Sequence, residues 1–136
     1  MFLGMLNEKE RKNFLELAKV AMEVDGEVTE SEQEMLENFR REVDLTDYEI
    51  KNTPIKDLKM FFDMSTKQSK KAVLFELAGM LYADQEVADS EAKWLKELGE
   101  GWGLRDSEIR KIIRWVMDFN DLLAEGFEYI TRKERL

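Results

Sequence analysis

Apolar side chains recur at intervals of three and four residues along most of this chain, which is the spacing of one face of an α-helix. The pattern predicts helices beginning after Asn7 and continuing to Val24, with others over 30–43, 53–62, 66–81, 89–100 and 106–126, and a short one around Ile50. No segment shows the alternation and turn pairs of β-strands. We therefore expect an all-α fold, with residues 1–136 forming a single compact bundle of about seven helices.

Residues at the expected helix ends support these boundaries. Asn7 is followed three residues later by Glu10, and Thr29 by Glu32, which is the spacing of a capping box. Gly26 follows the first helix, where a left-handed residue commonly ends a helix. The last helix is expected over 106–125, and the tail beyond it either continues as a helix or frays.

One acidic stretch occurs twice. "VDGEVTESE" (24–32) is followed 59 residues later by "ADQEVADSE" (83–91), and ten of the 26 positions over 25–50 are identical to those over 84–109. Such self-similarity at a fixed offset is typical of internal duplication. We therefore predict two repeated helix-turn-helix units, at about 8–50 and 67–109.

The composition removes most catalytic chemistry. The 136 residues include no cysteine and no histidine, so disulfides, thiolate or imidazole metal sites and the usual general base are all excluded. Any metal must therefore be held by oxygen ligands, which favours calcium, magnesium or manganese. We expect a protein that is not an enzyme, with a carboxylate-using hydrolase as the remaining catalytic alternative.

The charge is negative and unevenly distributed. The net charge of −9 disfavours nucleic-acid binding, which depends on neutralising phosphates. Seven acids and no base lie over 20–39, whereas six lysines and two acids lie over 51–71. The apolar runs are too short for a membrane span, and the first residues do not resemble a signal peptide. We expect a cytoplasmic protein that is not an integral membrane protein.

The duplicated turns supply the candidate metal ligands, because carboxylates gathered at one tight connection suit a hard cation. The predicted ligands are Asp25, Glu27, Glu32, Asp84, Glu86 and Glu91. The turns are not EF-hands: in the first copy Glu30 stands where that loop needs glycine, and Leu36 where it needs a bidentate glutamate. The second copy fails at the same two positions.

A purely structural interpretation accounts for part of this motif. Glu32 and Glu91 lie in helix first turns, where capping and the macrodipole favour an acid. Val28 and Val87 are expected to pack each turn onto the core. The two aspartates lie at helix C-termini, where a negative charge is unfavourable and requires a backbone donor or a cation. They are therefore the residues most indicative of a binding site.

Two other features suggest contact with a partner. Lys67, Lys70 and Lys71 form a basic helix start that could bind an acidic protein partner, although such lysines are also common on ordinary surfaces. The three tryptophans, Trp94, Trp102 and Trp115, could line a binding groove, but because they occur at helical spacing they are expected in the core.

The two segments "LELAKVAMEVDGEVTESEQEML" and "LFELAGMLYADQEVADSEAKWL" resemble the TerB-like family associated with tellurite resistance, a fold similar to the N-terminal domain of the DjlA co-chaperones. The resemblance places Asp25, Gly26 and Glu32 on the family motif, and Asp84 and Glu91 on its second copy, where Gln85 replaces the usual glycine. It implies a helical bundle with paired acidic turns, stress and tellurite resistance, metal association and action through partner complexes.

Two functions follow as hypotheses. The first is a non-enzymatic binding protein whose acidic turns associate with a divalent cation or with a basic partner. The second is a structural or adaptor domain that docks on a protein partner through its basic or apolar surface, with acidic turns that only cap helices.

Overall fold

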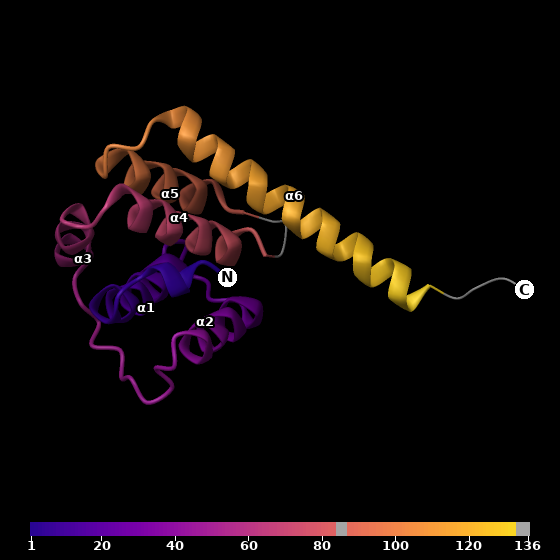
Figure 1. Ribbon diagram of the computed structural model, residues 1–136, viewed down its shortest axis with the longest axis horizontal. Helices are drawn as coiled ribbons and strands as arrows, with labels where there is room; N and C mark the ends of the chain where they lie inside the picture. Colours follow the sequence, from indigo (N-terminus) through magenta and orange to yellow (C-terminus); the bar gives the residue numbers. More distant parts are fainter. Residues whose placement is uncertain (84–86, 133–136) are drawn as a thin grey trace, which may run out of the picture.

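The computed structural model of the chain describes residues 1–83 and 87–132, and the described residues form helices without any β-strand. A short 3-10 helix, η1 (Leu3–Met5), comes first. The α-helices of the described residues are α1 (Glu8–Met22), α2 (Glu30–Glu42), α3 (Ile55–Asp63), α4 (Lys67–Leu81), α5 (Asp89–Gly101) and α6 (Asp106–Thr131). In Figure 1, α1 and α2 lie on one side of α4, whereas α5 and α6 lie on the other side. The expected all-α bundle is confirmed.

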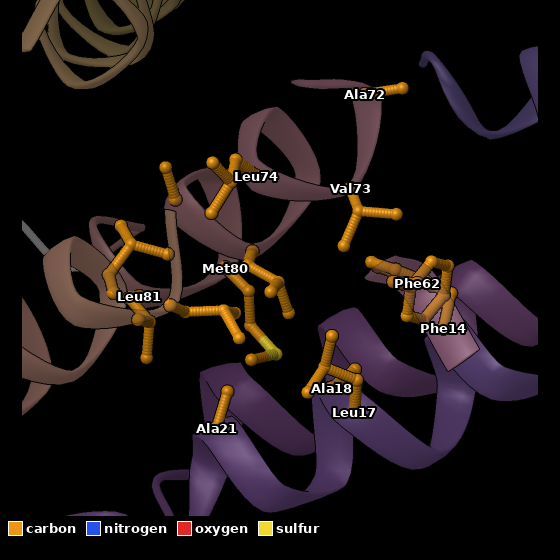
Figure 2. Packing of buried hydrophobic residues seen from close by; sticks show 14 of the residues in the cluster. Phe14, Leu17, Ala18, Ala21, Phe62, Ala72, Val73, Leu74, Met80 and Leu81 are labelled. Atoms are coloured by element: carbon orange, nitrogen blue, oxygen red, sulfur yellow. The ribbon is translucent and has the colours of Figure 1, made fainter. Parts of the chain in front are cut away.

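α4 is the central helix, packing against α1, α2, α5 and α6. Side chains on most of its faces are buried, as expected for a helix enclosed by others. Figure 2 shows Val73 and Met80 of α4 directed towards α1, where the small side chains of Ala18 and Ala21 lie. Small residues on α1 let the two helix backbones approach closely.

The predicted caps are present. The side chain of Asn7 accepts a hydrogen bond from the Glu10 N–H at 2.8 Å, and Glu10 accepts one from the Asn7 N–H at 2.9 Å. Gly26 adopts the left-handed conformation with φ of +81° after α1 ends. At the other end of the chain, the tail continues as a helix, since α6 ends at Thr131. The caps at Asn7 and Gly26 were predictable because each depends on local chemistry, whereas the end of α6 lies six residues beyond the predicted 125.

The short helix expected around Ile50 does not form, so the described residues contain six α-helices where about seven were predicted. Asp44 takes a left-handed φ of +57°, and the Leu45 N–H donates to the Arg40 carbonyl at 2.8 Å, which closes α2. Most of the chain from there to Pro54 is a non-helical connection.

Backbone N–H groups of this connection donate to the buried carboxylate of Glu16 in α1, and not to helical carbonyls. Its Oε2 accepts from the Lys51 N–H and the Tyr48 hydroxyl, both at 2.8 Å, and Oε1 accepts from the Thr53 N–H at 2.9 Å. Burial raises the pKa of Glu16, but these hydrogen bonds outweigh burial and hold the pKa below its usual 4.5. Burial and the same carboxylate raise the pKa of Tyr48 to about 12. Glu16 therefore fixes the connection onto α1.

Two glycines in helices give a matched test of the packing. A Cβ on Gly99 of α5 would lie 2.8 Å from Ile109 Cδ1 and 3.1 Å from Leu74 Cδ1, so α5 packs tightly on α6 and α4 here. We expect Gly99→Val to lower the free energy of unfolding by about 1–3 kcal/mol through overpacking. A Cβ on Gly79 of α4 would meet nothing within 4 Å, so Gly79→Ala should raise the free energy of unfolding by about 1 kcal/mol. Urea denaturation measures both, and equal signs would contradict the packing described.

Candidate functional site

The acidic turn between α1 and α2 closes on itself. The Asp25 Oδ1 accepts a hydrogen bond from the Glu27 N–H at 3.0 Å, and the Gly26 N–H donates to the Glu23 carbonyl at 3.1 Å. The aspartate at this helix end thus has the backbone donor that its unfavourable position requires. Asp25 and Glu27 are both exposed. Asp25 alone therefore does not require a cation.

Glu32 is the first buried acid of the site, with 5% of its surface exposed. Its Oε1 accepts from the N–H and from the hydroxyl of Thr29, both at 3.1 Å, and completes the predicted capping box. Its Oε2 is buried and has no hydrogen-bond partner among the described residues. A buried acceptor left unpaired is costly, on the order of 1–3 kcal/mol or more for a charged group. Capping therefore explains one oxygen of Glu32 and leaves the other unexplained.

Glu91 occupies the corresponding position in α5 and is equally buried, with 5% exposed. It accepts a hydrogen bond from the Ala88 N–H at 3.2 Å, but alanine has no side-chain oxygen to complete a reciprocal capping box. Burial raises the pKa of Glu91, and the negative charges of Asp25 and Glu32 raise it further against that one hydrogen bond. The charged form of Glu91 is thus destabilised by its surroundings.

The structure brings Asp25, Glu32 and Glu91 into one neighbourhood, from the α1–α2 turn and from the first turns of α2 and α5. Tyr82, the C-cap residue of α4, is near Glu91: burial and the negative charge of Glu91 raise the pKa of Tyr82. Within residues 1–83 and 87–132, no three acids are placed closely enough to hold a metal ion without moving. The arrangement is therefore a pair of buried glutamates with an exposed aspartate beside it.

The other sequence-predicted residues of the turns have different outcomes. Asp84 and Glu86 lie outside the described residues. Val28 was expected to pack onto the core, but 40% of it is exposed, so this prediction is wrong. Val87 is half-buried.

The three candidate partner-binding lysines lie in the first turns of α4. Lys67 and Lys71 both contact Glu108 of α6, with Nζ–Oε2 distances of 3.2 and 2.9 Å, and Lys70 is half-buried. These contacts, together with the Arg105 N–H, lower the pKa of Glu108 to about 2. Two of the lysines therefore join α4 to the start of α6, and a partner role for this surface stays a prediction.

The tryptophans do not share one environment. Trp102 is buried, Trp94 is half-buried against the core, and 42% of Trp115 is exposed, so the expectation of a core position is wrong for Trp115. Trp115 instead stacks on Phe119 with ring centroids 5.4 Å apart, and contacts Phe75 edge-on at 5.4 Å. Because Ile112 and Val116 on either side of it are buried, the exposure of Trp115 reflects the side of α6 that it faces and not the end of the bundle.

The structure therefore defines an all-α bundle with a pair of buried glutamates, Glu32 and Glu91. No protein-family model, curated protein or solved structure matches the chain. Among the helices of the described residues, none combines the length and the apolar character needed to cross a membrane.

Proposed function

We propose that this chain is a non-enzymatic binding protein of the TerB-like kind, in which the acidic turns hold a divalent cation. The observation that carries the proposal is the unpaired, buried Oε2 of Glu32 beside the buried Glu91. A cation would pair with that oxygen and compensate the repulsion between the two glutamates. Helix capping alone gives no reason to bury two carboxylates within range of each other's charge.

The donor set indicates the kind of cation. The ligands available from the described residues are the carboxylates of Glu32, Glu91 and Asp25, with the exposed Glu27 two residues after Asp25. Hard oxygen donors fit calcium, magnesium or manganese, and the chain offers no sulfur or imidazole ligand. Asp25 already lies beside Glu91, and the three carboxylates would have to draw closer together to surround one ion.

The lengths of the helices support an internal duplication as part of this proposal. α1 and α4 each span 15 residues, and α2 and α5 each span 13. Both pairs keep the offset found in the sequence, since Glu8 and Lys67, like Glu30 and Asp89, are 59 residues apart. Under duplication, Glu32 and Glu91 are the same residue of two copies, and the site lies where the copies meet.

Cation binding predicts a gain in stability that depends on Glu32. Calcium, magnesium or manganese at about 100 times its Kd should raise the free energy of unfolding by roughly 2.7 kcal/mol, while Glu32→Gln should abolish most of that gain. Calorimetric titration and thermal unfolding measure it, with sodium chloride at matched ionic strength to separate binding from screening of the net charge.

Glu10→Gln is the matched control, because Glu10 is also a buried capping-box glutamate, 7% exposed, but caps α1. It should leave the response to the cation unchanged. Absence of heat and of any thermal shift for the unmodified chain at millimolar concentrations of all three cations would eliminate the metal site. The acidic turns would then be helix caps only.

A further inference from the structure

α6 extends beyond the bundle that covers its first half. Ile109, Ile112 and Val116 are buried, and the same stripe continues at helical spacing through Phe119, Leu123, Phe127 and Ile130. In Figure 1 the C-terminal half of α6 projects away from the other helices. There 59% of Phe127 and 81% of Ile130 are exposed. The uncovered stripe is thus a direct continuation of the core.

The exposed apolar residues concentrate on this helix. Those that belong to α6 are Trp115, Met117, Leu122, Leu123, Phe127, Tyr129 and Ile130. Scattered single residues of this kind need no explanation, but a contiguous patch marks an interaction surface. The chain therefore presents one apolar surface on the distal half of α6, which we call the α6 stripe (Phe119, Leu123, Phe127 and Ile130).

Charge argues against a membrane as the occupant of this surface. At 100° per residue, Asp118, Asp121, Glu125 and Glu128 all lie on the side of α6 opposite the α6 stripe. No lysine or arginine occurs over 117–131. Helices that lie on membranes normally carry lysine and arginine on their polar face, and anionic lipid repels acids. The expected occupant is therefore a protein surface that is apolar.

Such a surface lies beside the α6 stripe on the same chain. A groove of about 400 Å³ lies between the N-terminal residues, α2, α4 and α6, and Glu42 and Glu76 are among its lining residues. Most of its lining is apolar and includes Met35, Phe39, Phe75, Trp115 and Phe119. The exposed end of the α6 stripe lies farther along the same continuous helix, so it cannot fold back into the groove of its own chain. A second copy can bring its own stripe there.

We propose that this chain forms a twofold-symmetric dimer in which the α6 stripe of each copy occupies the apolar groove of the other. With two α6 helices antiparallel about Leu123, Ile130 of one copy lies opposite Val116 of the other, and Phe127 opposite Phe119. The four acids of each helix then face solvent, and one surface serves both copies, as twofold symmetry requires.

The exposed part of the α6 stripe supplies part of the area that such a dimer needs, and the groove lining supplies more. Aromatic side chains bury about 150–250 Å² each, so the exposed parts of Trp115 and Phe127, with those of Leu123 and Ile130, amount to several hundred Å² per copy. A standard interface buries about 800 Å² per partner. The proposal goes beyond cation binding and does not depend on it.

Sedimentation equilibrium of the full chain tests the proposal. We expect a mass of twice 16.1 kDa at tens of micromolar. Phe127→Glu combined with Ile130→Glu should weaken association at least 100-fold. Because both side chains are exposed in the single chain, the double variant should still fold, which circular dichroism measures. Asp121→Asn, on the opposite face of α6, should leave the dimer intact.

Cross-linking supplies a second, geometric measurement. The chain has no cysteine, so Leu123→Cys introduces a single thiol at the proposed twofold axis. A short bismaleimide should link two copies through this thiol, whereas Asp121→Cys should give little product. A mass of 16.1 kDa at 200 µM, or dimers insensitive to the glutamate substitutions, would overturn the proposal. Binding of that monomer to neutral phosphatidylcholine vesicles would identify lipid as the occupant instead.

Discussion

Replacing Glu16 with alanine should lower the free energy of unfolding at pH 7 by about 3–5 kcal/mol. The substitution removes the acceptor for three hydrogen bonds, from Tyr48, Lys51 and Thr53, and each donor left unpaired costs about 1–3 kcal/mol where it stays buried. Urea denaturation measures the change. Glu23→Ala, at the C-cap of the same helix, removes only an exposed ion pair with Lys19 and should change stability by less than about 0.5 kcal/mol.

The effect of Glu16 should depend on pH in a defined direction. Its folded-state pKa lies below the usual 4.5, so the folded protein favours the charged form. The stabilisation is therefore present above pH 4.5 and is lost as pH falls through the folded-state pKa. The difference in unfolding free energy between the unmodified chain and Glu16→Ala should shrink below pH 4.5. A difference that grows on acidification would show that the carboxylate does not accept these bonds in solution.

Replacing Trp102 with alanine should lower the free energy of unfolding by about 3–5 kcal/mol, the usual range for a large buried aromatic residue. Trp102 ends α5, packs on Phe62 with ring centroids 5.5 Å apart, and donates its indole N–H to the Lys59 carbonyl at 3.3 Å. It therefore fixes α5 onto α3. Chemical denaturation followed by circular dichroism gives the value.

Trp102→Phe separates packing from hydrogen bonding at this position. Phenylalanine keeps an aromatic ring against Phe62 but has no N–H, so the loss should be much smaller than for alanine, on the order of 1–2 kcal/mol. An alanine variant that loses less than the phenylalanine variant would contradict the burial of Trp102.

The sequence was informative wherever structure depends on neighbouring residues. The capping boxes at Asn7 and Thr29 involve partners three residues away, and the left-handed Gly26 depends on its own missing side chain. The connection around Ile50 was mispredicted because its hydrogen bonds go to Glu16, more than 30 residues earlier in the chain. No local pattern identifies such an acceptor.

The candidate site illustrates the same limit. Glu32 and Glu91 were recognised as helix caps from their positions, but their burial and their mutual repulsion arise only when α2 and α5 meet. The exposure of Trp115, which lies between the buried Ile112 and Val116, likewise depends on which helices pack against that side of α6. A cue was available for the exposed end of α6, because its apolar stripe is longer than the helices predicted to cover it.

The central position of α4 couples the two sides of the domain thermodynamically. α1 and α2 bury their apolar faces on one side of this helix, and α5 and the first half of α6 do so on the other. Each side also has contacts of its own, α1 with α2 and α3, and α5 with α6, but displacing α4 removes buried surface from both sides at once. We therefore expect Glu32 and Glu91, which belong to opposite sides, to be separated in a single cooperative transition.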